Sequence, residues 1–324
     1  MLKAIALFSG GLDSILAAEL MRRQDIDVLC LTFTTPFFNA QKALSAIRQM
    51  KNLRLEVQDI TSEHLEMLKS PRYGYGKNMN PCIDCHALML KIAGKKMVET
   101  ESDFIITGEV LGQRPMSQNK QSLAVVAKNS GYQDDILRPL SARLLDPIKL
   151  ERENLIDRSR LLAIQGRGRK EQIKLAADFG IVDFAPPAGG CLLTDPIFSR
   201  RLRDLWSHHG DKNTRDIDML KYGRHFRIDN LCKIIVGRNH ADNEALKQLA
   251  TPDDLIMNMT HFPGPFVLVP YGDENAQHIA ATLCVRYSNV PDDQEAEVTC
   301  ARGQTSVSIH AKAATKEDCE RWII

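Results

Sequence analysis

The sequence predicts an α/β protein, with a doubly wound parallel sheet in residues 1–193 and a second, smaller α+β domain in residues 226–324. Over the first half of the chain, short apolar segments alternate with segments of helical periodicity, which is the pattern of strand–helix–strand units. Beyond residue 225, short strand-like segments follow one another between turns. We expect residues 194–225 to form a linker helix region between these domains.

The elements of the first domain follow from local patterns. Four apolar or alternating segments predict its strands, at 3–8, 27–33, 53–60 and 103–108. Three segments with apolar residues at helical spacing predict its helices, at 14–24, 41–52 and 85–100. Ligands of such sheets bind at the carboxyl ends of the strands.

The pattern changes at the turn cluster PPAGGC, residues 186–191. Helices are then predicted at 196–209 and 276–288, and strands at 233–237, 265–270 and 305–312.

Charge and composition exclude few classes of function. The net charge is +1, but residues 138–170 hold nine Lys or Arg against four acids, whereas 241–324 hold six against thirteen. We therefore expect any polyanion to bind the middle of the chain. No apolar run approaches membrane length, and the N-terminal segment lacks a signal-peptide pattern, so we expect a cytoplasmic protein with no membrane partner. In that compartment the eight cysteines are expected as thiols, metal ligands or redox groups.

The stretch LFSGGLDSIL, residues 7–16, places a glycine turn between the first predicted strand and helix. Converging backbone N–H groups and the helix dipole favour an anion there. Gly10 and Gly11 allow a close approach, while Ser9 and Ser14 add hydroxyl donors. Asp13 would repel a phosphate unless a cation lay between them, so we predict that it binds Mg²⁺. The alternative is that Asp13 only caps a helix.

SGGLDS resembles the PP-loop of the ATP pyrophosphatases, which adenylate a substrate and release pyrophosphate. The resemblance implies an adenine nucleotide alpha hydrolase-like fold. It also implies that the five residues Ser9, Gly10, Gly11, Asp13 and Ser14 bind ATP, with the adenine near Thr32 at the end of the second strand.

Two further stretches resemble the tRNA thiolases of this family. TGEVLGQRPMSQ, residues 107–118, is similar to a segment of the 4-thiouridine synthases, and the resemblance adds Gly108 and Gln113 to the ATP site. NPCIDC, residues 80–85, is similar to a segment of the tRNA 2-thiouridylases. There Cys85 and Cys191 match a pair of catalytic cysteines, which favours thiolation over amidation.

Cys82 forms a CxxC motif with Cys85, and together with Cys191 this resembles the iron–sulfur class of tRNA thiolases. The resemblance implies a [4Fe–4S] cluster held by these three cysteines, with one iron open to bind sulfide. Three alternatives stay open. Cys191 could carry a persulfide that Cys85 resolves, the cysteines could bind structural zinc with His86, or they could be inert. The other five cysteines are expected in the core: Cys30, Cys232, Cys284, Cys300 and Cys319.

Polar residues after the strand at 103–108 are expected to orient substrate: Glu109, Gln113, Arg114, Ser117 and Gln118. The stretch QGRGRKEQ, residues 165–172, combines glycines with basic residues, which suits an RNA backbone. We predict RNA contacts by Arg114, Arg167, Arg169, Lys170 and Arg238, and the alternative is that these are solvated surface charges.

The stretch at 233–270 resembles the RNA-binding domain of the NFACT proteins. The matching positions are Gly237, Arg238, Asn239, Asn243, Asp253, Asp254, Pro263 and Gly264. Met257 and Met259 replace a Trp and a His of that family, and a protein partner is the alternative to RNA. Arg224, His225 and Arg227 are expected to supply positive charge just before this stretch.

These observations lead to one main hypothesis. We expect an ATP-dependent tRNA sulfurtransferase that adenylates a nucleobase carbonyl and replaces its oxygen with sulfur. The sulfur would come from sulfide, a cysteine desulfurase or a carrier protein. The rival hypotheses are an ATP pyrophosphatase that thiolates or amidates a small molecule, and a non-catalytic RNA-binding protein.

Overall fold

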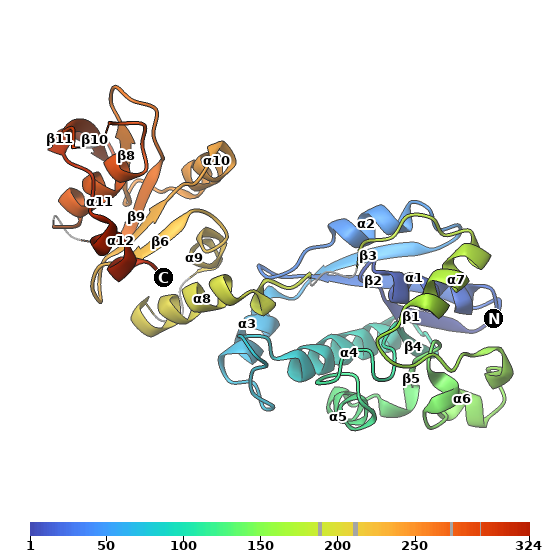
Figure 1. Cartoon of the computed structure of the whole chain (residues 1–324). Helices are drawn as coiled ribbons and strands as arrows, with labels where there is room; N and C mark the ends of the chain where they lie inside the picture. Colours follow the sequence, from blue (N-terminus) through green and yellow to red (C-terminus); the bar gives the residue numbers. More distant parts are fainter. Residues whose placement is uncertain (187–189, 210–212, 273–274, 292) are drawn as a thin grey trace. The chain divides into compact units, whose positions relative to one another are not determined.

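The computed structural model divides the chain into two compact units, Met1–Thr194 and Asp195–Ile324 (Figure 1). It describes residues 1–186, 190–209, 213–272, 275–291 and 293–324. The middle of the turn predicted at 186–191 therefore lies outside the described residues. Residues 195–225, which were expected as a linker, cluster with the second unit.

The first unit is built on a five-stranded parallel sheet in the order β3-β2-β1-β4-β5. Its strands are β1 (Lys3–Leu7), β2 (Asp27–Thr34), β3 (Arg54–Asp59), β4 (Phe104–Thr107) and β5 (Ile136–Leu137). The sheet is pleated, so Ala4 and Ala6 enter one core while Ile5 enters the other. The predicted doubly wound parallel sheet is confirmed.

Helices cover both faces of this sheet (Figure 1). The described helices are α1 (Leu12–Arg22), α2 (Gln41–Ile47), α3 (Thr61–Lys69), α4 (Cys82–Glu99), α5 (Lys120–Ser130), α6 (Lys149–Arg152) and α7 (Lys170–Phe179). Side chains of α1, α2 and α7 enter one core, and those of α4 and α5 enter the other. The helix expected at 41–52 ends at Ile47, because the following residues form tighter turns and Asn52 adopts a φ of 58°.

The second unit has a six-stranded antiparallel sheet in the order β11-β10-β8-β9-β7-β6. Its strands are β6 (Arg224–Arg227), β7 (Lys233–Val236), β8 (Leu255–Met259), β9 (Val267–Tyr271), β10 (Ala296–Arg302) and β11 (Thr305–Ala311). The helices are α8 (Pro196–His209), α9 (Thr214–Met219), α10 (His240–Leu249), α11 (Asn275–Arg286) and α12 (Lys316–Trp322). The expectation of a smaller α+β domain is confirmed.

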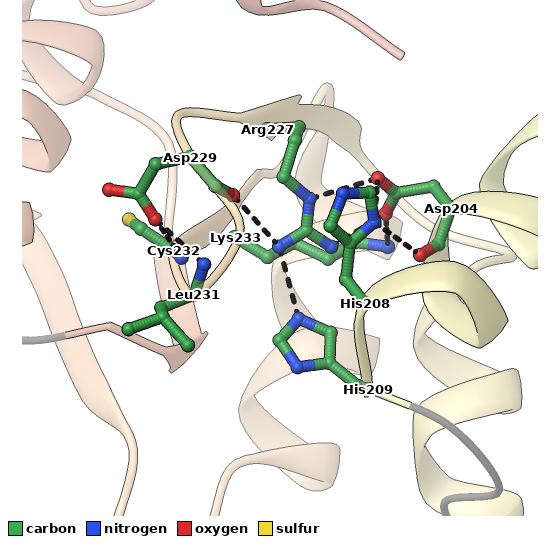
Figure 2. Close-up of polar contacts among 8 residues, drawn as sticks. All are labelled: Asp204, His208, His209, Arg227, Asp229, Leu231, Cys232 and Lys233. Carbon is green, nitrogen blue, oxygen red and sulfur yellow. Dashed lines mark hydrogen bonds and ion pairs between the residues drawn. The ribbon is translucent and has the colours of Figure 1, made fainter.

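A buried ion cluster ties α8 to the hairpin formed by β6 and β7 (Figure 2). The Asp204 carboxylate accepts two hydrogen bonds from the Arg227 guanidinium, at 2.9 and 2.8 Å, and one from Lys233 Nζ at 2.9 Å. Burial would raise the pKa of Asp204, but these two cations outweigh it and lower that pKa to about 2. Burial lowers the pKa of Lys233 to about 8, although Asp204 opposes this change. One carboxylate therefore compensates two largely buried cations.

Because Asp204 compensates both cations, Asp204→Asn is expected to lower the free energy of unfolding by about 3–5 kcal/mol. Urea unfolding monitored by circular dichroism measures this change. The matched control is Glu244→Gln, which removes an exposed carboxylate paired with Lys247 and should leave stability unchanged. A stability loss no larger than that of the control would show that the cluster does not hold α8 to the hairpin.

Candidate active site

The glycine turn leads directly from β1 into α1, as predicted. Gly10 has a φ of +72°, and a Cβ atom there would lie 2.3 Å from the backbone of Lys42 in α2. Ser14 Oγ donates to the Gly11 carbonyl at 2.8 Å and lies 3.3 Å from Ser9 Oγ. Only glycine fits at position 10, and the two hydroxyl groups lie together at the start of α1.

Residues Gly108 and Gln113, predicted for the same site, do reach this turn. A Cβ atom on Gly108 would lie 2.5 Å from Ser14 N, so the end of β4 packs directly on the first turn of α1. Gln113 Nε2 donates to Asp13 Oδ2 at 3.0 Å. The other oxygen, Asp13 Oδ1, is buried without a hydrogen-bond partner. An unpaired buried carboxylate oxygen is costly unless a proton or cation compensates it.

Thr32 lies near the carboxyl end of β2, which is next to β1. The preceding residue, Leu31, accepts a hydrogen bond from Phe8 N at 2.9 Å, just before the glycine turn. Thr32 itself is 5% exposed. The structure thus places Thr32 at the same edge of the sheet as the turn.

Cys82 and Cys85 both lie in the first turn of α4, since Cys85 N donates to the Pro81 carbonyl at 2.8 Å. The expectation that this helix begins at Cys85 is wrong by three residues. Burial raises the pKa of Cys85 well above its ordinary value, and Cys191 and Cys82 add to the rise by electrostatic repulsion. Burial also raises the pKa of Cys191 to about 11, with a smaller contribution from Cys82. The three predicted cysteines therefore lie within electrostatic reach of one another.

A buried histidine that the sequence analysis missed contacts this cluster. His64 is fully buried in α3, and its Nε2 lies 3.5 Å from Cys85 Sγ. Burial lowers the pKa of His64 to about 4, so the ring is neutral at physiological pH. Its ring lies 5.4 Å from that of Phe37, whose carbonyl accepts a hydrogen bond from Leu192 N at 3.0 Å. This chain of contacts joins the Cys191 turn to the CxxC helix.

Glu109 is a buried structural carboxylate. It accepts a hydrogen bond from Arg138 Nε at 2.9 Å and lies 3.1 Å from His86 Nδ1. Burial would raise the pKa of Glu109, but Arg138 and His86 outweigh burial and lower that pKa to about 2. His86 thus directs one ring nitrogen to Glu109. Arg138 is 8% exposed, and the sequence analysis missed its role because it is far from Glu109 in the sequence.

The basic residues predicted to contact RNA fall in two groups within the first unit. Arg114 is exposed and lies close enough to lower the pKa of Cys191 slightly. The loop 165–170 lies beside the segment after β4, because Gly166 N donates to the Leu111 carbonyl at 2.7 Å. Arg167 and Lys170 are exposed there, whereas Arg169 Nε is buried.

The motif of the second unit serves the fold at several positions. Asn239 caps α10 by accepting from Asp242 N at 2.9 Å, and Asn243 Oδ1 accepts from Phe266 N at 3.1 Å. A Cβ atom on Gly237 would lie 1.9 Å from that same oxygen. Arg238 pairs with Asp242 at 2.6 Å and stays 46% exposed.

Next to this motif, residues 224–227 offer less positive charge than predicted. His225 is fully buried, and burial lowers its pKa well below the ordinary value, so the ring is neutral. Arg227 is paired with Asp204. Only Arg224 among the three is left to offer positive charge, and its guanidinium lies over the Tyr287 ring at 4.5 Å.

The three thiols of the cysteine cluster are the type of ligand that iron–sulfur clusters use. One of them, Cys82 Sγ, accepts a hydrogen bond from Asn80 Nδ2 at 3.3 Å. As placed, however, no group of three or more Cys, His, Asp or Glu in the described residues could hold a metal ion. The five other cysteines are all buried, as expected.

Among the described helices, none combines the length and apolar character that a membrane span requires.

Two family models match the chain. Residues 2–149 match the model of the thiamine biosynthesis protein ThiI, and residues 223–323 match that of the NFACT protein RNA binding domain. The chain is thus similar to ThiI in residues 2–149 and to the NFACT RNA binding domain in residues 223–323, and these two parts are called the ThiI-type and NFACT-type domains below. The predicted PP-loop lies in the ThiI-type domain, and the motif around Arg238 lies in the NFACT-type domain.

Curated relatives match the ThiI-type domain. A "Probable tRNA sulfurtransferase" of Methanocaldococcus jannaschii is 30% identical over 153 residues, which are 43% of this chain and 36% of the relative. A protein of the same name from Thermococcus kodakarensis is 27% identical over 163 residues, covering 48% of this chain and 39% of the relative. The chain thus spans well under half of the length of these relatives.

Solved structures with partial similarity include one described as a 4-thiouridine synthetase–RNA complex with bound ATP. It is 21% identical with a TM-score of 0.42, and the match covers 60% of this chain and 45% of that one. A predicted subunit of a tRNA methyltransferase from Methanocaldococcus jannaschii is 14% identical with a TM-score of 0.35, covering 55% of this chain and 76% of that one.

Glu109→Gln is expected to lower the free energy of unfolding by about 3–5 kcal/mol at pH 7, because it leaves the buried Arg138 cation without its carboxylate. The folded-state pKa of Glu109 is about 2, below the ordinary carboxyl value. Its stabilisation is therefore present above that ordinary value and is lost as the pH falls toward 2. Urea unfolding of both proteins at several pH values should show the difference shrinking below about pH 4.

The control for this series is Glu66→Gln, an exposed carboxylate in α3 that pairs with Lys69, for which no comparable change is expected. A Glu109→Gln difference that stayed constant from pH 7 to pH 3 would contradict the assignment of the stabilisation to an ionised carboxylate.

Proposed function

We propose that this chain is an ATP-dependent tRNA sulfurtransferase. A carbonyl oxygen of a nucleobase attacks the α-phosphorus of ATP, and pyrophosphate leaves. A sulfur nucleophile then attacks the activated carbon, a carbon–sulfur bond forms, and AMP leaves with the former carbonyl oxygen. The names of the curated relatives and the match to the ThiI model support this proposal.

One observation carries the proposal: two adjacent residues, Gln113 and Arg114, approach the glycine turn and the cysteine cluster respectively. Gln113 Nε2 donates to Asp13 in the glycine turn, and the neighbouring Arg114 lies within electrostatic reach of Cys191. The same segment begins with Gly108, which packs on the first turn of α1. A substrate activated at the glycine turn would therefore be close to the cysteines.

The nucleotide would lie on the turn between β1 and α1. Backbone N–H groups at the start of α1 and the Ser9 and Ser14 hydroxyl groups suit phosphate oxygens. The partnerless Asp13 Oδ1 fits a Mg²⁺ ion between the carboxylate and the phosphates, and Gln113 would orient that carboxylate. The ion when bound would neutralise the charge of the departing pyrophosphate.

The sulfur would be handled by Cys82, Cys85 and Cys191. Bound to these thiolates, an iron–sulfur cluster would supply an open iron as a Lewis acid for sulfide. Burial and repulsion by the neighbouring sulfurs disfavour the thiolates of Cys85 and Cys191 without a compensating cation. Asn80 and His64 contact two of these sulfurs and would fix their orientation. The persulfide route through Cys191 and Cys85 uses the same residues.

The RNA would be held by exposed cations. Arg114, Arg167 and Lys170 lie in segments that follow or flank the end of β4, and the NFACT-type domain offers Arg238. Each phosphate contact would add to a salt-dependent affinity.

Asp13→Asn is expected to lower tRNA-dependent AMP formation at least about hundredfold, because the metal contribution amounts to several kcal/mol. Radiolabelled ATP with unfractionated tRNA measures AMP, and a mercury-containing gel detects thiolated tRNA. Asp178→Asn, an exposed carboxylate on α7, is the matched control and should keep full activity. ATP turnover that needs no RNA would instead favour a small-molecule substrate.

Anaerobic purification should give iron and acid-labile sulfide in the wild type, and both should fall in Cys82→Ala, Cys85→Ala and Cys191→Ala. The control is Cys300→Ala, which removes a buried thiol from β10 of the other unit and should keep the iron content. If the wild type binds no iron after anaerobic reconstitution, the cluster is excluded and the persulfide route is the one to test.

A further inference from the structure

We propose that the loop 72–77 is a stacking platform for unpaired bases of the RNA substrate beside the cysteine cluster. This loop, RYGYGK, lies between α3 and α4. The inference rests on the proposed function, because it assigns to that RNA a docking place which neither the glycine turn nor the basic loop 165–170 supplies.

The loop exposes two aromatic side chains. Tyr73 and Tyr75 are each 41% exposed, and no other aromatic side chain belongs to the exposed large hydrophobic residues of the described chain. Both rings lie on one loop, two residues apart. Exposed aromatic rings are the surfaces on which unpaired bases stack.

The two rings are held in place by their hydroxyl groups. Tyr75 Oη donates to the Leu68 carbonyl at 2.7 Å, and Tyr73 Oη accepts from Asn129 Nδ2 at 2.9 Å. Hydroxyl groups fixed to the protein leave the exposed parts of the rings for a ligand. A pre-oriented ring loses less conformational entropy on binding than a mobile one does.

Cations accompany the rings. Arg72 and Lys77 are exposed, and neither forms an ion pair with any described residue. The Arg72 guanidinium lies 5.6 Å from the centre of the Tyr73 ring and donates to Asn129 Oδ1 at 3.1 Å. Aromatic rings interleaved with unpaired cations match a polyanion whose bases are accessible.

Both ends of the loop are tied to the cysteine segments. The backbone N–H groups of Arg72 and Tyr73 donate to the carboxylate of Asp84, the residue before Cys85, at 3.1 and 3.0 Å. At the other end, Asn78 Nδ2 donates to the Thr194 carbonyl at 2.6 Å, three residues after Cys191. Hydrogen bonds thus hold this loop beside both segments that carry the cysteines, the start of α4 and the turn at Cys191.

This placement selects unpaired RNA as the occupant. In a duplex the faces of the bases are stacked on one another and cannot reach a tyrosine ring. A base that is to be modified must also leave its stack before an enzyme can reach it. Rings beside the cysteines can hold neighbouring bases in the unstacked arrangement that the reaction needs.

The experiment compares ring, hydroxyl and charge variants of the full chain. The probes are a fluorescein-labelled oligouridylate of about twelve nucleotides and an RNA hairpin duplex of the same length. Tyr73→Leu and Tyr75→Leu should each weaken oligouridylate binding about tenfold, and Tyr73→Phe and Tyr75→Phe by no more than about threefold. Binding of the duplex should change little.

Lys77→Ala should lower the slope of log affinity against log salt by about 0.7. Its matched control is Lys51→Ala, an exposed lysine in the connection that precedes the amino end of β3, which should leave the slope unchanged. ATP binding should stay at the wild-type value in every variant, because none of the altered residues lies in the glycine turn. Thermal unfolding of the two lysine variants should also stay at the wild-type value, because these side chains are exposed.

Three binding results would overturn the inference. They are Leu variants that bind oligouridylate as the wild type does, Phe variants that lose as much affinity as the Leu variants, and a wild type that prefers the duplex. Failure of the proposed function is distinguishable, because it appears as absence of tRNA-dependent AMP and of thiolated tRNA in the wild type itself. If the wild type thiolates tRNA and the Leu variants do so equally well at limiting tRNA, the loop has no role in binding substrate.

Discussion

The candidate active site depends on one steric constraint, the direct packing of backbone on backbone at the carboxyl edge of the parallel sheet. Gly10 lies against the backbone of Lys42, and Gly108 lies against the first turn of α1, with no space for a Cβ atom at either position. Because these two contacts draw α2 and the end of β4 onto the glycine turn, Gln113 reaches Asp13. Larger residues would separate the parts that the reaction must bring together.

Burial also affects the protonation of the titratable groups in the candidate active site. Glu109 is compensated by Arg138 and His86, and it stays ionised although it is buried. The cysteine cluster has the opposite balance, since burial and the repulsion of Cys191 and Cys82 all raise the pKa of Cys85. At Cys191 the lowering effect of Arg114 does not outweigh burial. The structural carboxylate is thus satisfied within the protein. The thiols are most stable in the protonated state or with a bound cation, which suits residues that handle sulfur.

The sequence was sufficient for the sheet and the glycine turn, because buried parallel strands and glycine-rich turns have strong local signals. The start of α4 was predicted three residues late. The residue before this helix is Pro81, which forms no side-chain cap, so the usual polar signal of a helix start is missing. The sequence analysis missed His64 and Arg138, and it did not predict that Arg227 is paired. The partners of these three residues are distant in the sequence, and only the fold brings them together. Tyr73 and Tyr75 carried a signal, a basic segment with aromatic residues between glycines, but exposure of the rings could not be known without the structure.

The second unit shows why a motif and a contact surface must be kept apart. Gly237, Asn239 and Asn243 match the NFACT-type motif, yet each is used by the fold, for close packing, for capping α10 and for joining that helix to the start of β9. Met257, one of the two positions predicted to depart from that motif, is fully buried in the core. The match at these positions is explained by their contacts within the domain. If this unit binds RNA as proposed, the contacts would come from side chains that the fold leaves exposed. Among the motif positions that the structure describes, Arg238 is the cation that would be offered to a phosphate, because it stays 46% exposed although it is paired with Asp242.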